Sequence, residues 1–309
     1  MGGGGGSSYR NWKTNQLTAA VRKDAEEAVA EYEVSLAGYF GELLSAFNDR
    51  DVELVGKRLD EIKSALEDEL ETTFDQIFGG SVAKHTYIDG LSDIDSLLVI
   101  NDSALEKKSP QHVLDQVVGV LKVQLGNEAV VDHGRMAVKV AYSDGMSIEL
   151  LPAIRTESSL RIPSIRQDRW SDIDPEAFRN ALTARNSDCG GKLIPTIKLA
   201  KAVIGNLPEK YQMEGYHVES LAVAAFQGYV GERTTTSMLP HFFERAKDLV
   251  LTGIKDPTGQ SSHVDEYLGA DNSPLRQEIG HVLGGIMKRM RTASASRSKQ
   301  QWETLFYTE

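Results

Sequence analysis

Two aspartates separated by one residue, Asp93 and Asp95, lie at the start of an apolar stretch that runs from Leu97 to Ile100. Side chains on a β-strand alternate between faces, so both carboxylates point the same way while Ile94 points into the core. Two adjacent carboxylates repel each other unless a cation lies between them. Oxygen ligands in this arrangement suit Mg²⁺, or Mn²⁺ in its place, carrying the phosphates of a nucleotide. The pair therefore predicts a metal site.

A glycine-serine turn precedes this pair. Gly80 and Ser81 follow a long helical pattern and precede the strand, so we expect a tight turn whose free backbone N–H groups hold phosphate oxygens. Lys84 and His85 come next, within reach of phosphates or of an acceptor nucleotide, although such a pair is also common on a plain surface. An Asp-x-Asp alone is weak evidence. The order of helix, turn, loop, acid pair and strand makes it specific.

Two-metal phosphoryl transfer needs a third acid from a neighbouring strand. Residues 137–142 and 146–151 read as two strands joined by an Asp-Gly hairpin turn, and Pro152 is expected to end their pairing. Glu149 lies within the second strand and faces opposite to its apolar neighbours. We expect its carboxylate to face Asp93 and Asp95. The alternative is an ordinary exposed glutamate on a strand.

A later segment offers groups that bind phosphate and base. Apolar residues recur at helical spacing from Leu193 to Ile204, which leaves Lys198 and Lys201 as neighbours on another stripe of the helix. Two lysines there could clamp phosphates, although paired lysines on a helix are usually solvated. Tyr216 follows, either as a base platform or as a half-buried core aromatic.

Residues 79–100, 147–153 and 192–219 resemble the bacterial cGAS/DncV-like nucleotidyltransferases (CD-NTases), the enzymes of cyclic-oligonucleotide antiphage signalling (CBASS). The likeness covers most of the chain beyond Asp51, with the motifs in the family's order. The resemblance implies an α+β fold: a polymerase-β-like mixed sheet with long N-terminal helices, and an α-helical C-terminal lobe. The nucleotide would bind in a cleft between the two lobes.

The resemblance also implies roles for single residues. Gly80 and Ser81 match the family's phosphate turn, Asp93 and Asp95 its metal-binding pair, and Glu149 its third acid. The third acid is more often aspartate in the family, and glutamate is one methylene longer, which can shift the metal that it helps to hold.

Lys201 matches a lysine that contacts the donor triphosphate, and Tyr216 a tyrosine that stacks on a base. The family usually has serine where this chain has Gly215, so one hydroxyl contact to phosphate is expected to be missing.

The activity implied is attack of a ribose hydroxyl on an α-phosphate, with two metal ions stabilising both oxygens, to make a cyclic di- or trinucleotide second messenger. The substrates would be nucleoside triphosphates (ATP, with GTP, UTP or CTP). The partners would be an effector protein that senses the product and regulatory proteins encoded alongside. Nothing in the residues themselves distinguishes cyclisation from linear extension.

Composition fits this expectation. The chain has 309 residues and a net charge of −11, which disfavours a wide nucleic-acid surface. Cys189 is the only cysteine, so an internal disulfide and thiolate-rich metal sites are excluded. No stretch has the apolar length of a membrane span, and we expect a cytoplasmic protein. A basic cluster around Lys288–Arg291 is more typical of a solvated helix than of a nucleic-acid site.

Three parts are expected along the chain: a flexible glycine-rich start at 1–8, a nucleotidyltransferase lobe at 9–160, and a helical lobe at 161–309. Leu17 to Phe47 reads as one or two helices. Apolar spacing from Val55 to Ile77 predicts one further helix, ending at Gly79-Gly80 and acting as a rigid spine for the phosphate turn.

Three alternatives stay open at this point. The first is another nucleotidyltransferase, such as an enzyme that extends tRNA ends, which would favour a basic RNA-binding lobe, or a toxin that attaches AMP to a protein, which would be much shorter. The second is a nucleotide-binding sensor that has lost catalysis, which the unusual Glu149 and Gly215 keep open. The third, an acidic helical interaction protein, leaves the acid pair on a strand unexplained.

Overall fold

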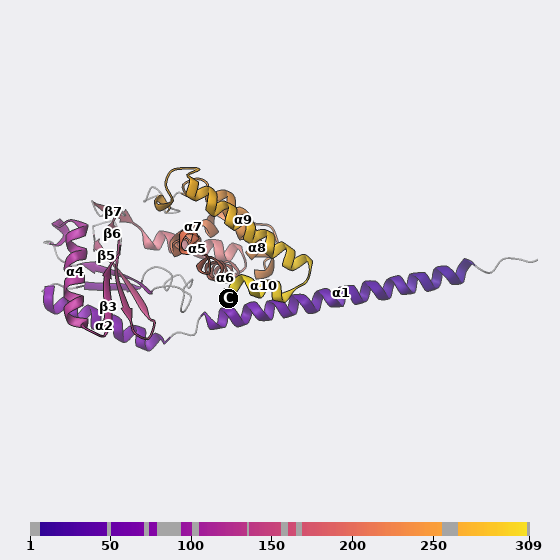
Figure 1. The fold of residues 1–309 in the computed structure, drawn as a ribbon, viewed down its shortest axis with the longest axis horizontal. Helices are drawn as coiled ribbons and strands as arrows, with labels where there is room; N and C mark the ends of the chain where they lie inside the picture. The colour runs from indigo at the N-terminus through magenta and orange to yellow at the C-terminus, as the bar shows by residue number, and fades with distance from the viewer. Residues whose placement is uncertain are drawn as a thin grey trace, which may run out of the picture.

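The computed structural model describes residues 7–47, 51–70, 74–78, 94–100, 105–134, 136–155, 160–164, 169–254 and 265–307. Its α+β architecture, a mixed sheet beside a helical lobe, confirms the predicted fold class (Figure 1). The α-helices are α1 Ser7–Ala46, α2 Val52–Leu70, α4 Pro110–Leu125, α5 Pro175–Asp188, α6 Leu193–Gly205, α7 Gly215–Ala225, α8 Thr235–Leu249, α9 Pro274–Ala295 and α10 Lys299–Phe306. The strands are β1 Phe74–Phe78, β2 Ile94–Ile100, β3 Ala129–His133, β4 Val138–Tyr142, β5 Ser147–Arg155, β6 Leu160–Pro163 and β7 Trp170–Ile173.

The strands form one mixed sheet in the order β1-β2-β5-β4-β3, with β6 pairing β5 and β7 pairing β6. Only β2 and β5 are parallel among these described pairs. A parallel pair needs a crossover connection, and here α4, β3 and β4 lie in sequence between the two strands. The β4–β5 connection is the predicted Asp-Gly hairpin turn, in which Gly145 adopts a φ of 92°.

Helices α2 and α4 cover one face of the sheet. Their apolar stripes, represented by Leu59 and Leu121, pack with Leu98, Ile148 and Leu150 in a single buried cluster. Figure 1 shows both helices on the same side of the strands. The opposite face carries a smaller apolar cluster that includes Val99 and Ala153. Both faces of the sheet therefore bury apolar side chains, and the larger core lies under α2 and α4.

The sheet differs from the prediction in two places. The expected single helix from Val55 to Ile77 is wrong, because α2 ends at Leu70 and residues 74–78 form β1, paired with β2. Apolar residues at 74, 77 and 78 fit a helical or a strand period, and pairing with β2 decides between them. Pro152 ends the pairing of β4 with β5, as expected, because the last pair is Val138 with Leu150, but β5 itself continues to Arg155. The missing N–H of Pro152 falls between the last β4 pair and the first β6 pair, where only β2 lies beside it.

The sheet also extends further along the chain than expected. Strands β6 and β7, at Leu160–Pro163 and Trp170–Ile173, lie at and beyond the expected lobe boundary at residue 160. The helices that follow begin at Pro175, and residues 105–173 otherwise contribute α4, a short 3₁₀ turn and strands. The sheet therefore ends, in the described part of the chain, just before α5.

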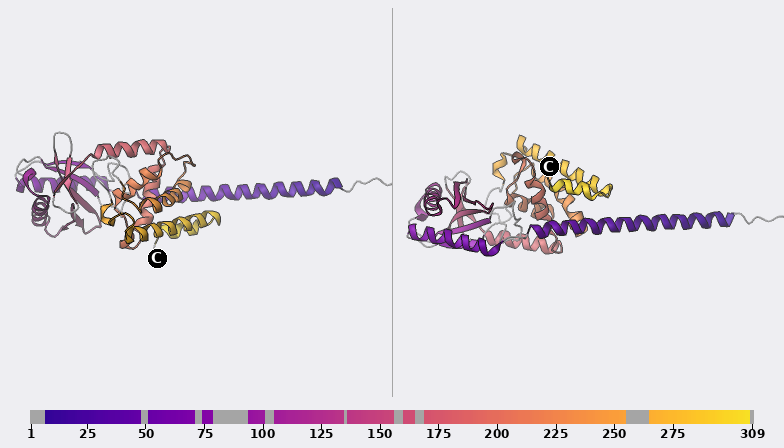
Figure 2. Two further views of the ribbon diagram at one scale, coloured as in Figure 1. Left: turned by 90° about the horizontal axis from the view of Figure 1, so that it is seen from above. Right: turned by 60° about the horizontal axis from the view of Figure 1, so that its bottom comes forward.

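The helical lobe packs around α6, α8 and α9. The C-terminal part of α1 joins this core, with Phe40 ringed by Trp302 and Phe306 at centroid distances of 5.4 and 5.8 Å. The preceding part of α1 projects beyond the rest of the molecule (Figures 1 and 2), and residues 21–28 are exposed. No helix in the described ranges is both long and apolar enough to cross a membrane.

Candidate functional site

The parallel pairing of β2 and β5 sets Asp95 opposite Glu149. Residues directly opposite each other on neighbouring strands project from the same face of a sheet. Ile148 and Leu150, on either side of Glu149, are fully buried under α2 and α4. Glu149, and Asp95 with it, therefore belong to the other face. The backbone brings two of the three predicted acids together, while Asp93 lies outside the described residues.

A lysine joins this row from the next strand. Lys139 of β4 is the register partner of Glu149, so it lies on the same face of the sheet. Lys139 thus lies beside a predicted metal-binding acid, although it is not among the site residues that we predicted from the sequence. The period-two pattern of the hairpin at residues 138–149 could have located it, because the Asp-Gly turn fixes which residues are opposite.

The predicted phosphate turn and the loop after it, with Gly80, Ser81, Lys84 and His85, lie outside the described residues. The structure does place the strands on either side of this segment, because β1 ends at Phe78 and β2 begins at Ile94. Phe78, the last residue of β1, pairs with Ser96 of β2, next to Asp95. The phosphate turn thus follows a strand rather than the helix expected from the sequence. The connection leaves and rejoins the sheet beside an acid of the proposed site.

The donor set suits the expected ion by its chemistry. Carboxylate oxygens are the ligands that Mg²⁺ prefers, and two of the three carboxylate positions are register neighbours. Within the described part of the chain, which excludes Asp93, no group of three His, Cys, Asp or Glu side chains comes together. The acids at 93, 95 and 149 stay a prediction for a metal site.

Lys198 and Lys201 of α6 are buried, with exposed fractions of 7% and 8%. This excludes the reading of a solvated lysine pair. The Lys201 ammonium Nζ donates to Oε1 of Glu219, a residue of α7 that is itself buried, across 2.8 Å. A buried lysine needs such a partner to stay charged. Sequence reasoning missed Glu219, since nothing in its own segment marks it as the partner of a lysine on α6.

Gly215, the first residue of α7, lies against this ammonium. A Cβ added at Gly215 would stand 3.3 Å from Nζ and 3.6 Å from Cε of Lys201. The missing side chain therefore makes room for the lysine head group. A serine here would place its side chain against the Lys201 ammonium, whereas glycine leaves that space to the lysine.

Tyr216 is an aromatic with one supported side. Its ring centroid lies 4.4 Å from that of Phe178 on α5, with the ring planes tilted by 44°. Phe178 is buried, whereas Tyr216 is 36% exposed. A half-exposed ring backed by a buried aromatic can stack on a base, and Phe178 is a supporting residue that sequence reasoning did not find.

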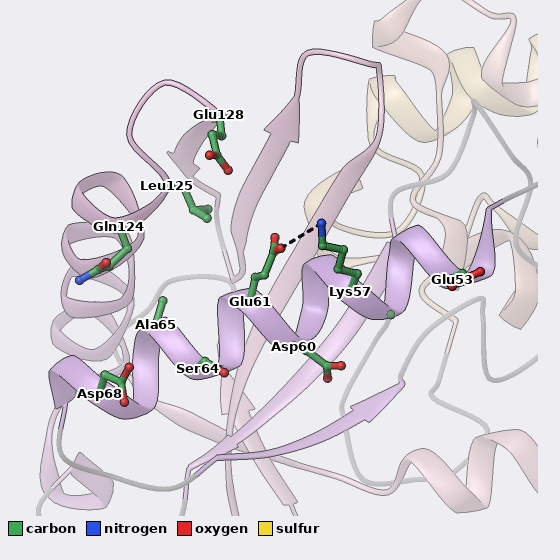
Figure 3. Close-up of a pocket in the computed structure, with 11 residues that line it drawn as sticks. Glu53, Lys57, Asp60, Glu61, Ser64, Ala65, Asp68, Gln124, Leu125 and Glu128 are labelled. Atoms are coloured by element: carbon green, nitrogen blue, oxygen red, sulfur yellow. Dashed lines mark ion pairs between the residues drawn. The ribbon is translucent and has the colours of Figure 1, made fainter.

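A shallow groove of about 830 Å³ lies elsewhere, between α2 and the end of α4 (Figure 3). It is on the α2 side of the sheet, opposite the face of Glu149. Its charged lining is Glu53, Lys57, Asp60, Glu61, Asp68 and Glu128. Five carboxylates against one ammonium repel a triphosphate, so this groove is a poor nucleotide site.

The model of the Second Messenger Oligonucleotide or Dinucleotide Synthetase (SMODS) domain matches residues 35–186, a range that contains Asp93, Asp95 and Glu149. Among curated proteins, a polyribonucleotide nucleotidyltransferase of Cytophaga hutchinsonii is 26% identical over 185 residues. Those residues are 59% of this chain and 23% of that protein, so the chain spans less than a quarter of that relative.

Several solved structures share the whole architecture. CdnC of E. coli MS115-1 with ATP superimposes with a TM-score of 0.63 at 16% identity, over 91% of this chain and 97% of that one. The CD-NTase CdnG of Bradyrhizobium diazoefficiens with GTP superimposes with a TM-score of 0.68 at 14% sequence identity. The match covers 88% of this chain and 94% of that one. The cyclic AMP-GMP synthase DncV of Vibrio cholerae superimposes with a TM-score of 0.61 at 12% sequence identity. The match covers 95% of this chain and 88% of that one. Residues 35–186 thus match the SMODS domain, and the chain has the fold of these CD-NTases, as the sequence resemblance predicted.

Proposed function

We propose that this protein is a nucleotidyltransferase that joins nucleoside triphosphates into a cyclic di- or trinucleotide, a second messenger of antiphage defence. The observation that carries the proposal is the parallel register of Asp95 with Glu149 inside the SMODS domain. Two carboxylate positions on one face of the sheet, with Asp93 as the third acid, would supply the ligands that metal-assisted phosphoryl transfer requires.

In the proposed reaction, a 3′- or 2′-hydroxyl oxygen of one nucleotide bonds to the α-phosphorus of another. The bond from that phosphorus to the bridging oxygen breaks, pyrophosphate leaves, and the hydroxyl proton passes to solvent. A second such step closes the ring. Asp93, Asp95 and Glu149 would hold Mg²⁺, which when bound neutralises phosphate charge and makes the hydroxyl more acidic.

The other residues bind and orient. The backbone N–H groups at Gly80 and Ser81 would hold phosphate oxygens, with Lys84 beside them. Lys201, oriented by Glu219, would share its charge with the donor triphosphate, and Lys198 adds a second cation on α6. Tyr216, backed by Phe178, would stack on a base.

The proposed substrates and partners are inferred from the similar solved structures. CdnC is seen with ATP and in a complex with HORMA, and CdnG with GTP. We propose nucleoside triphosphate substrates, an effector that senses the product, and regulatory proteins in the cytoplasm. A second candidate is a nucleotide sensor without catalysis. It is favoured by Lys201, whose charge Glu219 already balances.

The test incubates the purified chain with the four labelled ribonucleoside triphosphates and Mg²⁺ or Mn²⁺, and then with phosphatase. The wild type is expected to give phosphatase-resistant product. The double variant Asp93→Asn, Asp95→Asn is expected to give none, since it removes two metal-binding charges. A matched control, Asp60→Asn with Asp68→Asn in the exposed α2 groove, should keep activity. Product from the first double variant refutes the assigned metal site. Nucleotide binding without product favours the sensor.

A further inference from the structure

A buried polar network ties residues 265–276 to the start of α7. Arg276 Nη1 donates to Oδ2 of Asp265 across 2.6 Å, and both side chains are almost fully buried. The same guanidinium donates to the backbone carbonyls of Val250 and Gly269. Asp265 also accepts the backbone N–H of Ile254. An ion pair with this many hydrogen bonds gives its segment a fixed position.

Tyr267 links this network to the start of α7. Its hydroxyl accepts the backbone N–H of Glu214 across 3.2 Å and lies 2.8 Å from Nδ1 of His217. Because the hydroxyl oxygen already accepts, its own hydrogen is free for Nδ1, so we assign the His217 proton to Nε2. Nε2 then faces Oδ2 of Asp265 at 3.7 Å. Burial lowers the pKa of His217 to about 4, so the ring is neutral at pH 7 and can accept.

The contact falls where α7 needs it. Glu214 precedes the helix, and its side chain forms no capping hydrogen bond. The backbone N–H groups at a helix start lack partners within the helix. The Tyr267 hydroxyl, from outside the helix, therefore fixes the entry of the chain into α7 through the backbone of Glu214 and the ring of His217. The next two residues are Gly215, against Lys201, and Tyr216, against Phe178.

We propose that Tyr267 is a positioning residue for nucleotide binding, which holds the first turn of α7 so that Tyr216 and Lys201 meet the base and triphosphate of a bound nucleotide. The proposal rests on the proposed function, because it takes Tyr216 and Lys201 as nucleotide contacts. Tyr267 itself touches neither ligand nor reacting atoms in this scheme. It acts through the backbone at Glu214 and the ring of His217.

The test is Tyr267→Phe in the full chain, which keeps the ring packed edge-on against His217 and removes only the hydroxyl. Calorimetry measures the Kd of non-hydrolysable ATP and GTP analogues with Mg²⁺. We expect a Kd raised roughly 3- to 10-fold, the range that one lost hydrogen bond gives. Hydrogen exchange at residues 214–218 should speed up, with α6 and α9 unchanged.

The matched control is Tyr229→Phe. The Tyr229 hydroxyl donates to the carbonyl of Glu232 across 2.8 Å, beyond the other end of α7. This variant loses a similar bond and should leave the Kd unchanged. Adding Tyr216→Ala separates positioning from general destabilisation. If Tyr267 acts through Tyr216, most of the effect of Tyr267→Phe disappears in the Tyr216→Ala background.

A second pair of variants covers the case in which Tyr267→Phe does not fold. His217→Asn places an amide oxygen near the position of Nδ1 and should keep wild-type binding, whereas His217→Leu removes the acceptor and should weaken it. Equal Kd values for these two variants overturn the inference. An unchanged Kd in Tyr267→Phe, beside a wild type that binds, also overturns it. A wild type that binds no nucleotide overturns the proposed function instead.

Discussion

The ammonium of Lys201 lies 2.8 Å from the carboxylate of Glu219, and both side chains are buried where α6 meets α7. This pair connects the two helices that carry the proposed triphosphate and base contacts. A buried charge without its counter-charge is costly, so each partner constrains the other. The pair therefore helps to hold α6 against α7.

Replacing Glu219 by leucine is expected to lower the free energy of unfolding by about 3–5 kcal/mol, because it leaves the Lys201 charge buried without its partner. Urea unfolding followed by circular dichroism measures the change. Glu303→Gln, which breaks the exposed pair of Lys299 and Glu303, should cost under about 0.5 kcal/mol. The double variant Lys201→Met, Glu219→Leu should recover part of the loss. A cost for Glu219→Leu as small as that of the control contradicts the role of the pair.

Gly215→Ala is expected to displace the Lys201 ammonium, since the new Cβ would stand 3.3 Å from Nζ. The end of a lysine side chain moves easily, so the fold should survive while nucleotide binding weakens roughly 2- to 10-fold, the effect of one impaired charged contact. The Kd for a non-hydrolysable ATP analogue is the measurement. Gly56→Ala in α2 is the control, because a Cβ there meets nothing within 4 Å. Equal affinity in the two variants disproves the link.

Phe178→Ala is expected to destabilise the protein by about 3–5 kcal/mol, as the loss of a fully buried phenylalanine does. It should also weaken nucleotide binding, because Tyr216 loses its support. Phe178→Leu keeps most of the volume, so it should restore stability more fully than affinity. Chemical unfolding and calorimetric binding on the same samples separate the two effects. A leucine variant with wild-type affinity would mean that Phe178 is only a core residue.

Acid should destabilise the protein through His217. Its pKa is lowered from 6.5 to about 4 in the fold, mainly by burial, and Asp265 opposes the shift while Arg276 adds to it. The unfolded chain then binds more protons between those two values. This contribution is complete above pH 6.5 and falls as the pH decreases towards 4, by about 2 kcal/mol at pH 5. Urea unfolding of the wild type and of His217→Asn, each at pH 7 and at pH 5, measures this loss. An equal acid loss in both proteins rules out this histidine.

The sequence predicted those features that have a local signal. The 193–205 helix follows from its apolar spacing, and the 138–149 hairpin from its Asp-Gly turn. Phe74–Phe78 was misread, because a short apolar run has no clear period and its strand pairing is decided by distant residues. The β6 and β7 strands were missed for the same reason.

The candidate site divides in the same way. The acids on the strands and the lysines on α6 could be found from residue type and spacing. Their partners could not, because Glu219 and Phe178 are supplied by other helices. Tyr267 is a further case, since it reaches His217 from fifty residues away. Such contacts depend on how the helices pack, which no local pattern records.

Because β2 and β5 are parallel neighbours, Asp95 and Glu149 meet only after the crossover of α4, β3 and β4 between them has folded. During synthesis on the ribosome, a nascent chain that has passed Asp95 but not Glu149 therefore contains only one of these two carboxylate positions, and their pairing forms late in folding.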